Sequence, residues 1–228
     1  MIKVNRRALI LMAGGALGLL TGCSGATQEN ARFRVVHAAP STGALAVRFN
    51  VEVAVNSLAY KSASPYVNIL SGGHTLHLVD AATPLGAPRV SRSLEFEGSD
   101  YTALIIGASS TLDVVLVPDD SVPSATVGNA RLRVVHAASE LTGVDIYVTD
   151  PAASISSVSP NLTNIAFKGA SAYLDLPQGS YRVRVTPTGS KSVISDSGTT
   201  TLTKGHVYSS VTVGGFGVSL QNITLVDV

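Results

Sequence analysis

The chain has 228 residues, of which 45% are hydrophobic and 14% are charged, and its formal net charge is +1. Disordered chains are poor in apolar residues and rich in net charge, so this composition excludes a largely disordered protein. The balance of 16 Lys and Arg against 15 Asp and Glu also excludes the clustered basic excess of a nucleic-acid-binding protein. We therefore expect no nucleic-acid partner.

The first 22 residues have the pattern of an export signal. Lys3, Arg6 and Arg7 precede an uncharged apolar run over residues 8–20. That run is shorter than the roughly 20 residues that a membrane-spanning helix needs, and it suits the core of a cleaved signal peptide. Arg6 and Arg7 also loosely resemble a twin-arginine signal, so general secretion and twin-arginine export both stay open.

The segment Leu20-Thr21-Gly22-Cys23 resembles the bacterial lipobox, in which the cysteine is lipid-modified and becomes the new N-terminus. Cys23 is the single cysteine of the chain and stands where the motif requires it. We expect a signal peptide over 1–22, a lipidated Cys23 with a tether over 23–30, and contact with a membrane through that lipid. The protein is then an exported lipoprotein of the cell envelope. Ser24 rather than Asp after the cysteine favours the outer membrane in a cell that has two.

The sequence contains an internal repeat. Residues 31–39, ARFRVVHAA, recur as residues 130–138, ARLRVVHAA, with Phe33 replaced by Leu132. Further landmarks recur later in the same order, including Ser64 and Ser171, Tyr66 and Tyr173, Tyr101 and Tyr208, and Gly107 and Gly214. Order and spacing together indicate two copies of one module. We expect a first repeat over 31–118, a linker over 119–129 and a second repeat over 130–228.

Within each copy the apolar residues recur with the period of a β-strand. Residues 181–186, YRVRVT, alternate cleanly, whereas residues 101–106 and 207–213 are continuously apolar or β-branched. The continuous runs are typical of strands that are covered on both faces. Turn residues such as those of 71–73 and 177–179 separate the strands. The pattern predicts an all-β protein of two tandem antiparallel β-sandwiches, with about seven short strands each.

Several of these segments carry a family resemblance. Residues 133–138 (RVVHAA), 144–148 (VDIYV), 173–185 (YLDLPQGSYRVRV) and 205–208 (GHVY) are similar to the bacterial envelope family known as domain of unknown function 4397. The likeness covers nearly the whole chain after the signal and is weaker in the first copy. It implies an immunoglobulin-like or transthyretin-like β-sandwich, and it implies no activity.

His37 and His136 are candidate site residues because each ends the same strand of its repeat. Each shares a strand face with apolar side chains, so we expect each imidazole to hydrogen-bond the backbone of the following turn. The alternative is a small-ligand or metal site, in which Asp145 orients His136. The residue of the first copy aligned with Asp145 is Leu45, so that pair could exist only in the second repeat. His37, His136 and Asp145 are the weak ligand-site candidates.

No catalytic motif stands out in the chain. The sequence has no nucleophile elbow, no paired-histidine zinc motif and no Walker loop, and we assign no catalytic residue, metal or cofactor. Asp119 and Asp120 are expected in a solvated loop, with weak Ca²⁺ binding as the alternative. We therefore expect a non-catalytic envelope module that binds a protein or polymer, not an enzyme. An uncharacterised hydrolase is the third possibility, and the sequence does not indicate an oligomeric state.

Overall fold

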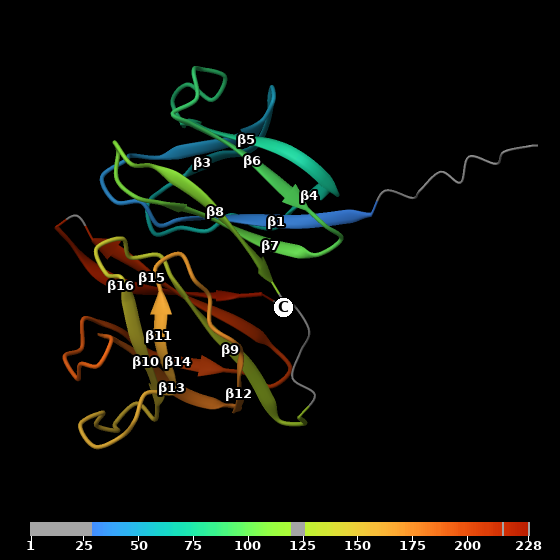
Figure 1. The fold of residues 1–228 in the computed structure, drawn as a ribbon. Helices are drawn as coiled ribbons and strands as arrows, with labels where there is room; N and C mark the ends of the chain where they lie inside the picture. Colours follow the sequence, from blue (N-terminus) through green and yellow to red (C-terminus); the bar gives the residue numbers. More distant parts are fainter. Residues whose placement is uncertain (1–28, 120–125, 216, 228) are drawn as a thin grey trace, which may run out of the picture.

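The computed structural model describes residues 29–119, 126–215 and 217–227. These residues form sixteen β-strands and no helix, so the predicted all-β class is confirmed (Figure 1). Across the same residues, the structure contains no helix with the length and apolar character needed to span a membrane. The expected signal peptide over 1–22, Cys23 and the tether as far as residue 28 lie outside the described residues.

The first repeat is a sandwich of two four-stranded sheets. One sheet has the strand order β4-β1-β7-β8 and the other β3-β2-β5-β6. The strands are β1 (Asn30–His37), β2 (Leu45–Phe49), β3 (Glu52–Leu58), β4 (Val67–Leu70), β5 (Gly72–Asp80), β6 (Val90–Phe96), β7 (Asp100–Ile106) and β8 (Asp113–Asp119).

The second repeat has the same arrangement, with sheets ordered β12-β9-β15-β16 and β11-β10-β13-β14. The equivalence of the two repeats extends to single hydrogen bonds. The Ser64 hydroxyl accepts a bond from the backbone N–H of Val35 at 2.9 Å, and Ser171 does the same for Val134 at 2.9 Å. The strands are β9 (Asn129–His136), β10 (Gly143–Thr149), β11 (Leu162–Ala166), β12 (Leu174–Pro177), β13 (Gly179–Pro187), β14 (Ser195–Leu202), β15 (Val207–Gly215) and β16 (Val218–Val226).

Two features of each sandwich differ from the expectation. Each repeat has eight strands rather than about seven, and one pair in each is parallel, namely β1 with β7 and β9 with β15. The first strand of each repeat, β1 or β9, belongs to the same sheet as the last two strands of that repeat. It lies beside the first of those two, β7 or β15. A parallel pair needs a long connection, here the strands of the opposite sheet together with one edge strand of the same sheet, and local sequence patterns carry no signal for such a connection.

The central strands of the two middle sheets, β1 and β7 in one and β9 and β15 in the other, are covered on both faces. In β1, Phe33 and Val35 point into the core of the first repeat, whereas Val36 lies in a second apolar cluster that both repeats share. In β7, every residue from Tyr101 to Ile106 is buried. The continuously apolar runs of the sequence therefore do mark strands with two buried faces.

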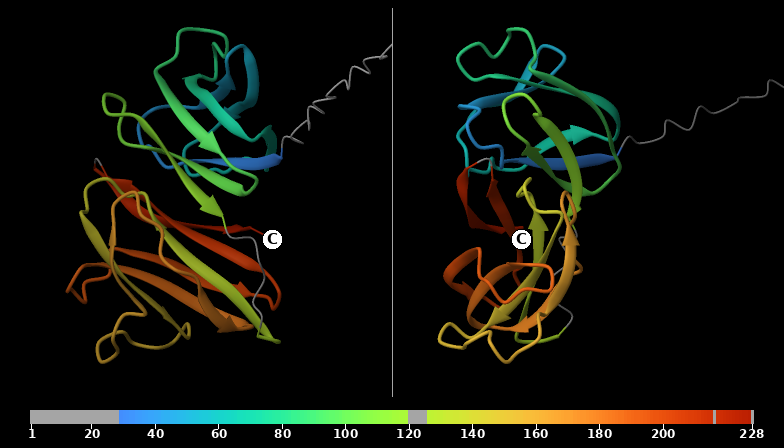
Figure 2. Two further views of the ribbon diagram at one scale, coloured as in Figure 1. Left: turned by 45° about the vertical axis from the view of Figure 1, so that its right-hand side comes forward. Right: turned by 60° about the vertical axis from the view of Figure 1, so that its left-hand side comes forward.

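The shared cluster joins the two repeats face to face. In Figures 1 and 2 the β4-β1-β7-β8 sheet of the first repeat lies against the β12-β9-β15-β16 sheet of the second. Because buried apolar side chains from both repeats fill this contact, the two sandwiches form one packed unit. The cluster consists of Val36, Ala38, Leu104, Ile106, Val117, Val135, Ala137, Val211 and Val213.

The start of the linker needs a correction. We predicted a linker from residue 119, but Asp119 is the last residue of β8 and is only 6% exposed. The expectation of a solvated loop at Asp119 is wrong because its carboxylate is directed into the contact between the repeats, where it has charged and hydroxyl partners. Asp120 lies outside the described residues.

Candidate functional site

The two histidines at the strand ends are fully buried. His37 Nε2 lies 3.0 Å from the carbonyl oxygen of Gly43, and His136 Nε2 lies 3.1 Å from that of Leu141. Both carbonyls belong to the turn that follows the strand, as the sequence predicted. The bonds hold the turns between β1 and β2 and between β9 and β10.

The hydrogen bonds of His136 define its neutral form. Nε2 donates to the Leu141 carbonyl, while Nδ1 accepts from the backbone N–H of Ala138 at 3.3 Å. Burial lowers the pKa of both His37 and His136 below the ordinary value of 6.5, because an imidazolium would lose its hydration there. Both side chains are therefore uncharged structural groups at neutral pH.

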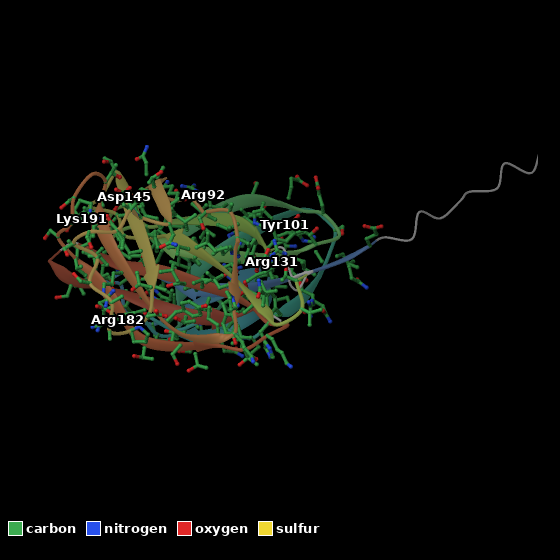
Figure 3. All side chains as sticks on the ribbon, turned by 90° about the horizontal axis from the view of Figure 1, so that it is seen from below. Arg92, Tyr101, Arg131, Asp145, Arg182 and Lys191 are labelled. Atoms are coloured by element: carbon green, nitrogen blue, oxygen red, sulfur yellow. The ribbon has the colours of Figure 1, made fainter. Side chains whose placement is uncertain are left out.

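Asp145 is bound by backbone groups of β11 and of the turn between β13 and β14. Its Oδ1 accepts from the N–H of Asn164 at 2.8 Å, and its Oδ2 accepts from the N–H of Gly189 at 2.8 Å. Figure 3 places Asp145 at the end of the molecule away from the start of β1, with Lys191 nearby. Through these two bonds, Asp145 connects β10 to β11 on one side and to the β13–β14 turn on the other. The structure thus gives Asp145 and His136 separate partners and shows no ligand face common to both.

Within residues 29–119, 126–215 and 217–227, no three His, Cys, Asp or Glu side chains gather as metal ligands. His74 and His77, three residues apart on β5, also have separate partners. His74 Nε2 lies 2.8 Å from the Leu70 carbonyl oxygen, and His77 Nδ1 lies 2.7 Å from the Ser91 hydroxyl. Neither His37 and His136 nor His74 and His77 are therefore arranged to bind one metal ion together.

The most highly charged buried site lies between the two repeats. Arg34 of β1 donates from Nε to the Thr102 hydroxyl of its own repeat at 3.0 Å. Its Nη2 forms an ion pair with Asp227, which follows β16 in the other repeat, and its Nη1 donates to the Val226 carbonyl at 3.2 Å. Both members of the pair are buried, so the charges meet in a medium that screens them poorly.

The same arrangement recurs in the opposite direction. Arg133 of β9 donates from Nε to the Ser209 hydroxyl of its own repeat at 2.8 Å and pairs through Nη2 with Asp119 of the first repeat. Its Nη1 donates to the Pro118 carbonyl at 2.6 Å. Each repeat therefore supplies one arginine and one carboxylate, and each arginine binds the carboxylate of the other repeat. The geometry is that of an approximate two-fold axis within one chain.

Hydroxyl groups donate further hydrogen bonds to the two carboxylates. Thr102 donates to Asp119 at 2.7 Å, and Ser209 donates to Asp227 at 2.7 Å. Asp119 also accepts from the phenol of Tyr66 at 2.7 Å. Burial raises the pKa of the Tyr66 phenol, and burial likewise raises the pKa of Asp227 although Arg34 opposes the change.

Our sequence analysis did not identify these four charged residues as a site. Arg34 and Arg133 lie within the repeated segment RxRVVHAA, but a charged residue that alternates with apolar ones is also typical of a solvent-facing strand. The sequence does contain one signal of this site. An aspartate stands at the end of the last strand in each repeat, in VPD over 117–119 and in LVD over 225–227. Matching positions of opposite charge in two copies could have suggested pairing across the copies.

A second site is a cavity of about 450 Å³ in the first sandwich. It opens between β3 and β4, which are the edge strands of the two facing sheets. Apolar side chains predominate in its wall, and its size falls within the range of roughly 300–1,000 Å³ common for small-molecule sites. The apolar lining consists of Phe33, Phe49, Val53, Ala54, Val67, Ile69 and Leu70, and the polar lining of Asn50, Glu52, Asn68 and His74.

The floor of the cavity is an aromatic cluster. The ring of Phe33 lies 5.4 Å from that of Phe49 and 5.7 Å from that of Phe96, and the ring of His74 lies 5.7 Å from that of Phe49. The first of these contacts is edge-to-face, a favourable geometry for aromatic pairs. Leu132 and Val148 occupy the positions of Phe33 and Phe49 in the second repeat, since Phe49 pairs with Leu76 and Val148 with Val183. The aromatic floor is thus a feature of the first repeat. The same register corrects the expected alignment of Asp145, whose counterpart in the first repeat is Ala46 rather than Leu45.

Fold and site together define a tandem pair of β-sandwiches that are joined through an exchanged pair of buried ion pairs. A family model described as "Domain of unknown function (DUF4397)" matches residues 31–147 and 130–228. The chain therefore belongs to the DUF4397 family, and the two matches agree with two tandem copies.

No curated protein matches the chain. Among solved structures, the Bacillus anthracis TIE protein is 10% identical with a TM-score of 0.26, and the match covers 85% of this chain and 34% of that one. The chain thus spans about a third of the TIE chain. A structure titled "Alpha-glucan binding by a streptococcal virulence factor" is 11% identical with a TM-score of 0.27, covering 79% of this chain and 91% of that one.

Proposed function

We propose that this protein is a non-catalytic lipoprotein of the cell envelope that presents two β-sandwiches as one rigid binding unit. The observation that carries the proposal is the contact between the repeats, where Arg34 and Arg133 each bind a carboxylate of the other repeat. A buried contact of this kind opposes independent motion of the two sandwiches. One anchor before the first repeat would then hold both.

The anchor is Cys23, on the strength of the lipobox Leu20-Thr21-Gly22-Cys23. Five residues lie between Cys23 and Glu29, where the described structure begins, which makes six steps from one Cα to the next. Such a tether spans at most about 20 Å, since an extended chain advances roughly 3.3–3.6 Å per residue. The lipid would therefore hold the first repeat close to the membrane surface, in the outer membrane where the cell has two.

Two observations support a binding rather than a catalytic role. His37 and His136 are fully buried and bond carbonyl groups of the following turns, and Asp145 bonds backbone N–H groups, so these side chains act as structural groups. The chain does offer exposed turns and sheet edges, of which β3 and β4 are two, and these suit a protein or polymer partner.

The test of the anchor is mass spectrometry of the mature N-terminus together with cell fractionation. Wild-type chain is expected in the membrane fraction, with a lipid-modified Cys23 as its first residue. The Cys23→Ser chain is expected in the aqueous fraction and unmodified. Membrane association of Cys23→Ser equal to that of wild type would contradict the proposal.

A second candidate function is small-ligand binding, and the cavity between β3 and β4 is the observation that favours it. This candidate differs from a metal or ligand site at His136 and Asp145, whose bonds are taken up by the backbone. The measurement is thermal unfolding with and without candidate ligands, because a ligand present at 100 times its Kd raises the stability by about 2.7 kcal/mol.

A further inference from the structure

The cavity of the first sandwich lies beside the point where the tether enters the fold. The carbonyl oxygen of Glu29 accepts a hydrogen bond from the backbone N–H of Ser71 at 2.9 Å. The next residue, Asn30, pairs in the sheet with Leu70, which lines the cavity. The chain that leads to Cys23 therefore starts at the rim of the cavity.

The rim on this side carries two exposed aliphatic side chains beside exposed polar ones, Asn50, Glu52 and Asn68. Val51, in the turn between β2 and β3, is 80% exposed, and Leu70 is 50% exposed. The neighbours of Val51 on both sides, Asn50 and Glu52, line the cavity. Two exposed aliphatic side chains thus flank the opening of an apolar cavity, at the end of the sandwich that carries the tether.

The lining decides which chemistry the cavity accepts. Of its four polar side chains, His74 is already bonded to the Leu70 carbonyl, and Glu52 is the one carboxylate of the lining. No Lys or Arg lines the cavity to bind a phosphate or carboxylate. The wall offers aliphatic side chains above an aromatic floor, which suits a flexible hydrocarbon chain.

We propose that this cavity is an acyl-chain site and that its occupant is an acyl chain of the lipid on Cys23. The inference rests on the proposed lipidation of Cys23. The five residues between Cys23 and Glu29 allow a reach of about 20 Å, which is enough to bring the lipid to the opening. Because the chain is attached, its effective concentration at the cavity is on the order of millimolar, so a weak intrinsic affinity is sufficient for occupancy.

The cavity is then a binding site for one acyl chain of the protein's own lipid anchor. Each methylene group that enters the cavity leaves water, and the gain in free energy is similar to the gain on entering a bilayer. A chain can therefore move between bilayer and cavity at little net cost. The cavity would shield an acyl chain from water whenever the protein is away from the membrane.

The experiment uses the fluorescent fatty acid cis-parinaric acid as the probe, with full-length exported chains in detergent-free buffer. In Cys23→Ser the cavity has no attached lipid, and we expect saturable binding of one probe per chain. Ala54→Phe in the same background adds a ring to the cavity wall and is expected to weaken binding by about tenfold or more. Ser57→Phe adds the same ring at an exposed position of β3 that does not line the cavity, and should leave binding unchanged.

A second variant, Val67→Phe, fills the cavity from β4, and circular dichroism establishes that each variant is folded. If folded Ala54→Phe and Val67→Phe both bind the probe as Cys23→Ser does, or if Cys23→Ser does not bind it, the cavity is not an acyl-chain site. Either result would overturn the inference without touching the proposed anchor, whose own test is the mass of the N-terminal residue.

The occupant is tested with the wild-type chain after mass spectrometry has shown the lipid on Cys23. Because the attached chain competes for the cavity, wild type is expected to bind added probe at least about tenfold more weakly than Cys23→Ser. Equal binding by the two chains would show that the attached lipid does not occupy the cavity. An unmodified Cys23 would overturn both the occupant and the proposed anchor, while the Cys23→Ser measurement would still report on the cavity itself.

Discussion

Arg34 in β1 and Arg133 in β9 occupy equivalent positions of the two repeats, and each forms a buried ion pair with the carboxylate that ends the other repeat. The two arginines also bond a hydroxyl of their own repeat, Thr102 or Ser209. Each arginine thereby connects three segments that are distant in sequence. This exchange couples the packing of one sandwich to the presence of the other.

Removing Asp227 leaves the buried Arg34 with Asp119, 4.0 Å away, as its remaining charged partner. We expect Asp227→Ala to lower the free energy of unfolding by about 3–5 kcal/mol. Asp80, whose side chain is 56% exposed, pairs with Arg89 at the surface, and Asp80→Ala should cost no more than about 1 kcal/mol. Urea-induced unfolding of the three chains measures both values. A cost for Asp227→Ala as small as that of the control would contradict a stabilising role of the buried pair.

Replacing both partners should be less damaging than replacing one. In the double variant Arg34→Met with Asp227→Leu, two apolar side chains take the place of two buried charges, and such exchanges are often neutral in other proteins. We expect the double variant to be more stable than Asp227→Ala by about 2 kcal/mol or more. A double-mutant cycle that finds additive losses would indicate that Arg34 and Asp227 do not interact.

The buried histidines predict how stability depends on pH. Burial lowers the folded pKa of His37 and His136 below 6.5, so below pH 6.5 the unfolded chain binds more protons than the folded one. The unfolding free energy therefore falls as the pH falls from 6.5 to the lowered pKa, by at most about 1.4 kcal/mol per pH unit for each histidine. Asp227, whose pKa is raised, acts in the opposite sense, because its stability contribution decreases as the pH rises above 3.8 through the raised value.

The pH dependence is assigned to its source by substitution. His37→Gln combined with His136→Gln should flatten the loss of stability below pH 6.5, because neither glutamine takes up a proton there. His206→Gln, at an exposed position, should retain it. Unfolding by urea at a series of pH values gives the slopes. An unchanged slope in the double variant would show that other groups cause the loss.

Gly107 is predicted to tolerate no side chain. Its φ is +90°, and a Cβ there would lie 2.3 Å from the carbonyl oxygen of Thr111. Gly128 has a closely similar φ of +92° but open space around the Cβ position. Gly107→Ala should therefore cost about 3 kcal/mol or more, and Gly128→Ala only the roughly 1–2 kcal/mol of the left-handed backbone. Thermal unfolding of the two variants gives the comparison, and equal losses would argue against the close contact at Thr111.

The all-β class, the duplication and the doubly covered strands could be predicted from the sequence, because each depends on local spacing. The alternation of Phe33, Val35 and His37 placed these residues on one face, and the structure confirms it. What covers the opposite face could not be predicted, since Arg34 between apolar residues reads equally well as a surface charge. Asp119 looked like part of a linker for a related reason. Its partner, Arg133, lies in the other repeat, and no local sequence motif connects the two residues.

The parallel strand pairs and the cavity could not be predicted from the sequence, for a different reason. The pairing of β1 with β7 depends on which strands of one sheet become neighbours, and alternation is the same in parallel and antiparallel pairs. The cavity depends on the separation of two sheet edges, β3 and β4, and on the aromatic floor below them. Periodicity fixes which side chains face inward, but it does not fix how completely they fill the space.

The central claim is that the two repeats form one unit, and differential scanning calorimetry of the Cys23→Ser chain tests it most directly. A packed contact with exchanged ion pairs predicts a single transition in which the calorimetric enthalpy equals the van't Hoff enthalpy for the whole chain. Two separate transitions, or a van't Hoff enthalpy of about half the calorimetric value per chain, would contradict it. Either result would mean that the two repeats unfold independently.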